Sequence, residues 1–395
     1  MAVAGGAEVL AAAVCAAYDE LPRKGKPSGH EWTVLAGWAV TPVPLSEVSD
    51  ADEVTVLAMG TGTKCLPPGR MAADGGSLVD AHAEVAAKRA LQAALIDALS
   101  GEGVVELVPI PGAAASDPGA PLVELGPQQY VHLYVSQTPC GDASIFVTDA
   151  ASAVSYAPAS KRKAFKGLDM QRTGARAVGG ASGDAKEPGT GYHTPGLLRT
   201  KPGRGEPSQS MSCSDKIARW VALGMQGTLL GSLVAPIRLS SIVVGELFDR
   251  QALERALVTR VAALLPPGVA VPVVAAAPAA TFAASRAALT TVGGYDADEL
   301  TTTGASVVAW RRRERAATGS RWSSHAVLGA RGRLLGTTKA KAKNLSSASP
   351  VSPALMLARF VAALESVFPE RAAVLAAKAG VESVYEVPYK AEVGA

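Results

Sequence analysis

The residues most capable of chemistry are a histidine and a glutamate two positions apart and two distant cysteines. His82 and Glu84 lie in the stretch SLVDAHAEVAAKRAL (77–91), at the start of a predicted helix. In mid-helix, side chains two residues apart face different directions. We therefore expect both in the first turn, where they can converge on a group bound at the helix end. Cys140 follows a predicted strand and a proline, and Cys213 opens another predicted helix.

These residue types fit a catalytic zinc site. Zinc binds histidine nitrogen and cysteine thiolate, and a catalytic site leaves the fourth position open for water. A helix N-terminus favours negative charge and so lowers the pKa of a thiol placed there. Glu84 has the chemistry to carry a proton to and from a water at the open position.

Each residue taken alone has a more ordinary interpretation. A histidine at the start of a helix is usually a cap or a surface residue, and His-Ala-Glu before a helix is a common sequence. Cys15 and Cys65 are expected to be ordinary buried thiols. Cys65 stays outside the predicted ligand set although it lies close to the predicted site. The combination with the two later cysteine motifs is what favours zinc.

Composition limits the class of protein. The chain has 395 residues, 48% hydrophobic and 18% charged, which is enough to bury a sizeable core. The net charge of +3 means that affinity for nucleic acid must come from local basic patches. Four cysteines are too few for a disulfide scaffold, so we expect a reducing intracellular compartment, the nucleus, the cytoplasm or both. No segment approaches the roughly 20 apolar residues of a membrane span, so no membrane partner is expected.

Strand and helix patterns alternate along the chain, which predicts an α/β fold. Strand patterns are β-branched or alternating and end at turn residues. Helix patterns begin at serine or aspartate caps. The predicted strands are 31–42, 53–65, 130–140, 305–312 and 323–332; the predicted helices are 81–99, 212–231 and 352–367; a strand followed by a long helix is predicted in 239–265.

The domain organisation is predicted from the same patterns. Residues 1–29 are expected to form an N-terminal helical segment rather than a secretory signal, because no basic stretch precedes the apolar run. Residues 30–395 are expected to form one catalytic domain. Three stretches rich in Pro, Gly, Ala and Ser are predicted to be long surface insertions, near 109–127, 157–198 and 270–285.

Six motifs carry a resemblance to a known family. GTGTKC, DAHAE, TPCGDASIF, LRTKPGRG, SMSCSDKIARW and SSIVVGELFD occur in this order. The zinc deaminase signature pairs His-x-Glu with Pro-Cys-x-x-Cys, but here the second cysteine stands far along the chain in Ser-Cys-Ser-Asp-Lys. In that respect, and over about residues 31–363, the sequence closely resembles the tRNA-specific adenosine deaminases and their relatives, the adenosine deaminases acting on RNA.

The resemblance implies a fold, a reaction and a zinc site. The fold would be a cytidine-deaminase-like core, a mixed β-sheet with helices on both faces. His82, Cys140 and Cys213 would bind zinc, and Glu84 would move the proton. A water activated by zinc would attack C6 of adenine, and ammonia would leave to give inosine.

The resemblance also implies contacts with RNA and with a buried inositol hexakisphosphate. Thr63 and Lys64 match residues that meet the sugar and phosphate of the flipped nucleotide, and Arg204 lies where the relatives have a base-flipping loop residue. Asp80 and Lys201 would form the relay between the anion and the zinc site. Lysine and arginine buried on packed helices are costly without an anion. The expected anion-binding residues are Lys88, Arg89, Ser210, Lys216, Arg219, Trp220 and Gln226.

Two departures from the family pattern concern this anion. Val79 stands where the family has an asparagine before the aspartate. The family also continues past the sequence VYEVPYKAEVGA into a helix with further anion contacts, and Tyr385 and Lys390 are expected to begin that region.

The substrate expected from the resemblance is a transfer RNA. No double-stranded RNA-binding module is expected before residue 30, which favours a compact structured RNA over a long duplex. We expect adenosine 37 in the anticodon loop of alanine tRNA, because an unpaired base is easier to extrude. We expect a monomer and no DNA partner. The basic stretches 157–219, 311–315 and 339–343 are either RNA contacts or solvated surface.

Three alternatives to this function differ in their substrate or in their lack of catalysis. The chain could deaminate adenosine in another structured RNA. It could be a non-catalytic RNA-binding relative, although such proteins typically lose the glutamate or a ligand, and all four residues are present. A free-nucleoside or cytosine deaminase is disfavoured because the compact cysteine pair is absent.

Overall fold

The computed structural model describes residues 2–149, 167–178, 183–187, 189–202, 206–313, 321–338, 340–341 and 344–379. Within these ranges one mixed eight-stranded sheet organises the fold, in the order β14-β13-β8-β2-β3-β16-β17-β18. Strands β8, β13 and β14 are parallel, and the neighbours from β8 to β18 are antiparallel. The strands are β2 (Leu35–Thr41), β3 (Thr55–Thr61), β8 (Tyr130–Gln137), β13 (Leu239–Glu246), β14 (Val273–Ala276), β16 (Ala305–Arg311), β17 (Trp322–Leu328) and β18 (Arg333–Leu334).

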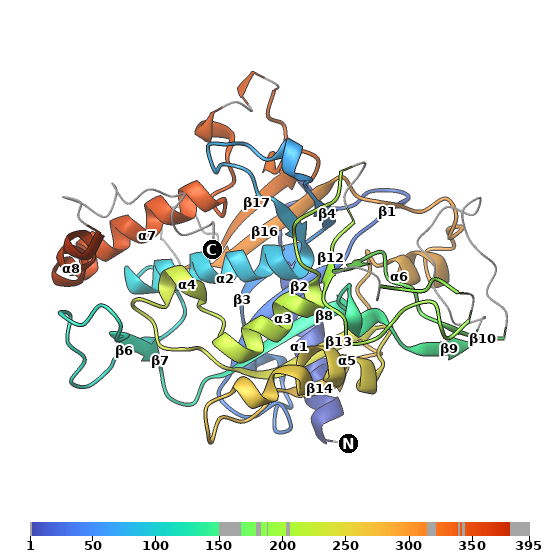
Figure 1. Cartoon of the computed structure of the whole chain (residues 1–395), viewed down its shortest axis with the longest axis horizontal. Helices are drawn as coiled ribbons and strands as arrows, with labels where there is room; N and C mark the ends of the chain where they lie inside the picture. Colours follow the sequence, from blue (N-terminus) through green and yellow to red (C-terminus); the bar gives the residue numbers. More distant parts are fainter. Residues whose placement is uncertain are drawn as a thin grey trace.

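Helices cover both faces of this sheet. In Figure 1, α2 and α3 cross in front of the strands, α1 lies behind them, and α7 and α8 extend to the left. Alternate side chains of β2 divide two cores: Leu35 packs on the α1 side, and Trp38 on the α2 side. The predicted mixed sheet with helices on both faces is confirmed. These helices are α1 (Ala2–Asp19), α2 (Ala83–Leu99), α3 (Cys213–Leu223), α5 (Arg250–Leu257), α7 (Pro353–Val367) and α8 (Pro369–Ala379).

Shorter elements surround the sheet. Two short helices are α4 (Gly227–Leu230) and α6 (Arg286–Thr291), and the paired short strands are β1 (Glu31–Trp32) with β15 (Thr301–Thr302), β4 (Thr63–Cys65) with β5 (Asp80–His82), β6 (Leu107–Pro109) with β7 (Val123–Leu125), β9 (Val147–Asp149) with β10 (Leu168–Met170), and β11 (Arg176–Ala177) with β12 (Arg199–Thr200).

The alanine-rich helix α2 packs very closely on β3. A side-chain carbon added to Gly60 would lie 2.3 Å from the backbone nitrogen of Ala87 and 2.7 Å from the β-carbon of Ala86. Both alanines are fully buried. The alanines of α2 therefore have a packing role: they let the helix that begins at His82 lie against the centre of the sheet.

Three sequence-based expectations need correction. Segment 270–285 is not a surface insertion, because it contains β14, the edge strand paired with β13; a run of four small or branched residues is too short to show a period. Segment 109–127 is held in place by the fully buried Arg371, which donates to backbone carbonyls within it. The long helix expected in 239–265 is shorter than predicted, because α5 ends at Leu257 and Thr259–Leu264 form a separate 3-10 helix.

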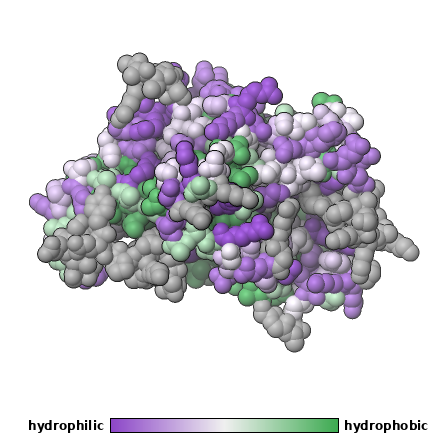
Figure 2. All heavy atoms as spheres, turned by 90° about the horizontal axis from the view of Figure 1, so that it is seen from above, coloured by the Kyte–Doolittle hydropathy of each residue, from purple (hydrophilic) through white to green (hydrophobic). Residues whose placement is uncertain are grey.

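The surface seen from above is mostly hydrophilic, with hydrophobic residues in separate groups between the polar ones (Figure 2). Across the described part of the chain, no helix has both the length and the apolar character needed to cross a membrane.

Helix α1 contributes to the second core, so the N-terminal segment packs on the sheet. Leu10 is fully buried there with residues of β2 and β13. We expect Leu10→Ala to lower the free energy of unfolding by about 3 kcal/mol, through lost burial and the cavity left behind. Urea denaturation measures this, with the exposed Ala12→Ser as control. Equal stability of Leu10→Ala and wild type would contradict the docking of α1.

Candidate metal centre and adjoining cation-lined pocket

Three elements bring the predicted metal ligands together. Strand β5 ends at His82, which also stands at the N-cap of α2. Cys140 lies in the turn after β8, and Cys213 is the first residue of α3. Gly141 makes the close approach possible: its φ is +109°, and a side-chain carbon there would lie 2.2 Å from the Ser212 hydroxyl oxygen.

The three side chains form a compact donor set. The Sγ atoms of Cys140 and Cys213 lie 3.8 and 3.6 Å from the Nδ1 atom of His82. All three donor atoms lie within 4.8 Å of one another. A tetrahedral zinc ion with ordinary bond lengths separates sulfur from nitrogen by about 3.6 Å. The cluster can therefore hold a metal ion, and its one nitrogen and two sulfurs suit zinc with a fourth position left open.

The electrostatics of the two thiols differ. A hydrogen bond from Cys213 and the nearby His82 hold the pKa of the Cys140 thiol well below its usual value, although burial opposes this. Burial and the neighbouring Cys140 raise the pKa of Cys213. The backbone N–H of Cys213 donates to the Cys140 sulfur at 3.4 Å. Cys140 is therefore the first to become a thiolate, and a bound cation would favour ionisation of both.

Glu84 sits next to this cluster and is only 3% exposed. Burial and the negative charge of Cys140 raise the pKa of the Glu84 carboxyl, whereas His82 and Lys201 act in the opposite direction. A buried carboxyl with a raised pKa holds a proton more readily than an exposed one, which suits a group that accepts a proton and passes it on.

Asp80 joins the metal cluster to a second group of charged residues. One carboxylate oxygen accepts hydrogen bonds from the ammonium groups of Lys201 and Lys216, each at 2.5 Å, and from the Ser210 hydroxyl at 2.7 Å. The other accepts from the backbone N–H of His82 at 3.1 Å. Burial would raise the pKa of Asp80, but the two lysines outweigh it and hold that pKa well below its usual value.

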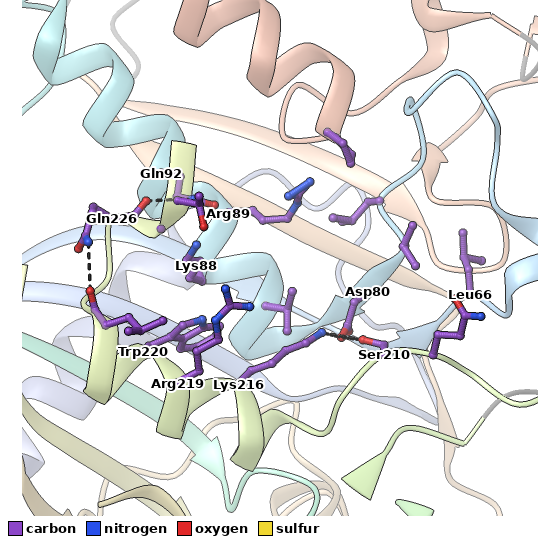
Figure 3. Close-up of a pocket in the computed structure, with 18 of the residues that line it drawn as sticks. Leu66, Asp80, Lys88, Arg89, Gln92, Ser210, Lys216, Arg219, Trp220 and Gln226 are labelled. Atoms are coloured by element: carbon purple, nitrogen blue, oxygen red, sulfur yellow. Dashed lines mark hydrogen bonds and ion pairs between the residues drawn. The ribbon is translucent and has the colours of Figure 1, made fainter. Parts of the chain in front are cut away.

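Beyond Asp80 lies a cavity of about 610 Å³. Lys88 and Arg89 of α2 face Lys216 and Arg219 of α3 across it (Figure 3). Burial and the charges of Arg89, Arg219 and Lys216 lower the pKa of Lys88 to about 7. All seven predicted anion-binding residues line this cavity: Lys88, Arg89, Ser210, Lys216, Arg219, Trp220 and Gln226.

Two glutamines refine this description. Gln226 already uses its side-chain amide on the backbone, accepting from Ile237 at 3.1 Å and donating to Leu223 at 3.1 Å. Gln92 also lines the cavity and was missed from the sequence. Its spacing of one helical turn after Lys88 was a signal that could have found it.

Of the three residues predicted to contact RNA, the structure describes Thr63 and Lys64. Thr63 pairs with His82 across β4 and β5, and its hydroxyl oxygen is buried without a hydrogen-bond partner among the described residues. Lys64 donates to the Thr302 hydroxyl. Arg204, like Tyr385 and Lys390, lies outside the described residues. Cys65 contacts Ser208 at 3.3 Å and does not belong to the metal cluster.

Comparison with known proteins finds one matching family. The model of the adenosine-deaminase (editase) domain matches residues 58–378. A protein named tRNA-specific adenosine deaminase 1 from Macaca fascicularis is 32% identical over 335 residues, which cover 61% of this chain and 66% of that protein. The protein of that name from Drosophila melanogaster is 35% identical over 228 residues, covering 57% of this chain and 51% of its own length.

A protein named double-stranded RNA-specific editase Adar, also from Drosophila melanogaster, is 30% identical over 243 residues, covering 60% of this chain and 33% of that protein. The chain therefore spans just under two thirds, or less, of the length of these relatives.

Removal of one thiol tests the metal cluster. We expect Cys213→Ser to abolish retention of zinc through dialysis, because a hydroxyl is a poor substitute for a thiolate. Cys65→Ser is the matched control, since it alters a half-buried cysteine near the cluster without touching it. Metal content by mass spectrometry is the readout. Zinc loss from both variants, or from neither, would contradict the ligand assignment.

Proposed function

The chain belongs to the adenosine-deaminase (editase) family, and on this basis we propose that it hydrolyses adenosine to inosine in RNA, with zinc as its metal and a transfer RNA as its substrate. The observation that carries the proposal is the convergence of His82, Cys140 and Cys213 beside the buried Glu84. Three ligands with an adjacent carboxyl describe a site with an open position rather than a closed structural one.

The residues divide the chemistry as follows. His82, Cys140 and Cys213 would hold the zinc ion, which when bound would supply a Lewis acid to the water that attacks C6 of adenine. Glu84 takes a proton from that water and delivers it to the leaving amine, and its raised pKa suits both transfers. Lys201, fully buried beside the thiols, holds a fixed positive charge that offsets the negative donor set.

The substrate side of the site lies on β4. The unpaired hydroxyl of Thr63 is aligned with His82 and can donate to the sugar of an extruded nucleotide. Lys64 next to it supplies a cation for the adjoining phosphate. These contacts recognise a nucleotide within a chain rather than a free base.

We further propose adenosine 37 of alanine tRNA as the target. Relatives named tRNA-specific adenosine deaminase 1 support a transfer RNA. An anticodon-loop adenosine is already unpaired, so its extrusion avoids the few kcal/mol that a duplex base costs.

Replacement of the proton carrier tests the reaction. We expect Glu84→Gln to lower the rate of inosine formation in an alanine tRNA transcript by at least about 100-fold while zinc stays bound, because the amide cannot accept the proton. Inosine is read as guanosine after reverse transcription. The exposed Glu124→Gln is the matched control. Full activity of Glu84→Gln would contradict its role; zinc-loaded wild type that forms no inosine in this transcript would reject the alanine tRNA target.

The cation-lined pocket supports a second element of the proposal, a bound inositol hexakisphosphate. Four cationic side chains face one cavity, and burial, together with the charges of the other three, lowers the pKa of Lys88. A polyphosphate would offset the repulsion among these cations, three of which, Lys88, Arg89 and Lys216, are partly withdrawn from water. Ser210 and Trp220 add a hydroxyl and an indole to a lining that also contains Asp80 and several apolar side chains.

The pH dependence of inositol hexakisphosphate binding tests whether Lys88 contacts the polyphosphate. Below about pH 7 the Lys88 ammonium is already charged, whereas above it a bound polyanion must draw a proton onto Lys88. From pH 6 to pH 8 we therefore expect the affinity of wild type for inositol hexakisphosphate to fall about tenfold more than that of Lys88→Arg, whose guanidinium stays charged. Titration calorimetry measures both proteins. Identical pH profiles would contradict the assignment of Lys88.

A further inference from the structure

We propose that residues 167–178, 183–187 and 189–202, most of which fall in the predicted surface insertion 157–198, act as a clamp that fixes the spacing of the two cysteines, with Arg199, Asp184 and Thr173 as positioning residues. The proposal rests on the metal site described above. A continuous chain of hydrogen bonds runs through this segment from the residue after Cys140 to the residue before Cys213.

The first half of the chain starts beside Cys140. The backbone N–H of Gly141 donates to the Thr173 hydroxyl at 3.2 Å, and the N–H of Thr173 donates to Nε2 of His193 at 3.2 Å. The other ring nitrogen of His193 contacts Asp184 at 2.9 Å. Because Nε2 accepts, this histidine must be neutral with its proton on Nδ1. Burial lowers the pKa of His193, which favours that form.

The second half ends beside Cys213. The guanidinium of Arg199 donates to both oxygens of Asp184, each at 2.6 Å. The backbone carbonyl of Arg199 accepts from the N–H of Ser212 at 2.7 Å, and its N–H donates to the Asp215 carboxylate at 3.0 Å. Ser212 is the N-cap of α3. Strand β12, which contains Arg199, therefore holds the helix that presents Cys213.

A second, shorter connection supports the same loop. The fully buried Asp142 accepts a hydrogen bond from the N–H of Gly196 at 2.7 Å. It also forms an ion pair with Arg255 of α5 at 3.1 Å. The turn after Cys140 is thus attached both to the insertion and to a core helix.

The burial of Arg199 distinguishes a positioning role for this residue from a role in RNA binding. Arg199 is 0% exposed, so its charge cannot meet a phosphate on an RNA surface. Burial would raise the pKa of Asp184, but the hydrogen bonds from Arg199 and His193 outweigh it and hold that pKa far below its usual value. A buried ion pair adds little net stability, yet it fixes geometry, because either partner left alone is costly.

Metal affinity tests the clamp without relying on activity. Thr173→Val removes the acceptor for Gly141 with little change in shape, and Thr173→Ser restores it. Asp184→Asn weakens the pair with Arg199. We expect Thr173→Val and Asp184→Asn to bind zinc about tenfold more weakly in a chelator competition and to alter the absorption spectrum of the cobalt-substituted protein. Thr173→Ser and the exposed Arg176→Gln should match wild type.

The outcomes separate the clamp from the site it serves. Weaker zinc binding with an unchanged melting temperature of the metal-free protein supports a positioning role. Wild-type zinc affinity and cobalt spectrum in both Thr173→Val and Asp184→Asn would overturn the clamp. If wild-type protein itself bound no zinc, the proposed metal site would fall instead.

Discussion

The shared carboxylate of Asp80 is the interaction on which both halves of the site depend. It compensates the ammonium groups of the fully buried Lys201 and the partly exposed Lys216, and it also orients the backbone of His82. An ammonium transferred from water to the interior costs several kcal/mol unless it is paired. Since Lys201 is fully buried, removal of this one carboxylate would leave two cations uncompensated between the thiols and the cation-lined pocket. The metal cluster and the cation-lined pocket are therefore one electrostatic unit.

Helix α2 gives this unit its geometry. Glu84, Lys88 and Gln92 are spaced by four residues, so they follow one face of the helix from the metal cluster to the far wall of the pocket. That face carries polar and charged groups, while the buried alanines on the opposite side pack against Gly60 of β3. A helix that packs so closely cannot shift without a clash. Glu84 and Lys88 thus keep a fixed separation from the sheet.

Much of the site was predictable because its signals are local. His82 with Glu84, Cys140 after a proline, and Cys213 after a capping serine each carry a short-range pattern, and the structure brings them together. The fold class followed from alternating strands and helices. Strand β14 was missed because four residues show no period. The bracing of the insertion was missed because Arg199 and Asp184 pair through tertiary packing, which neither composition nor spacing encodes.

The split cysteine pair explains why such bracing is needed. In a Pro-Cys-x-x-Cys motif the backbone of one short turn sets the distance between the two sulfurs. Here Cys140 follows a sheet strand and Cys213 begins a helix, so no local backbone geometry relates them. The two segments meet through direct hydrogen bonds, because the N–H of Ser214 donates to the carbonyl oxygen of Cys140 at 3.0 Å and the N–H of Cys213 donates to the Cys140 sulfur. Hydrogen bonds through Thr173, Asp184 and Arg199 add to these before a metal binds, which makes an irregular stretch of chain a support of the metal site.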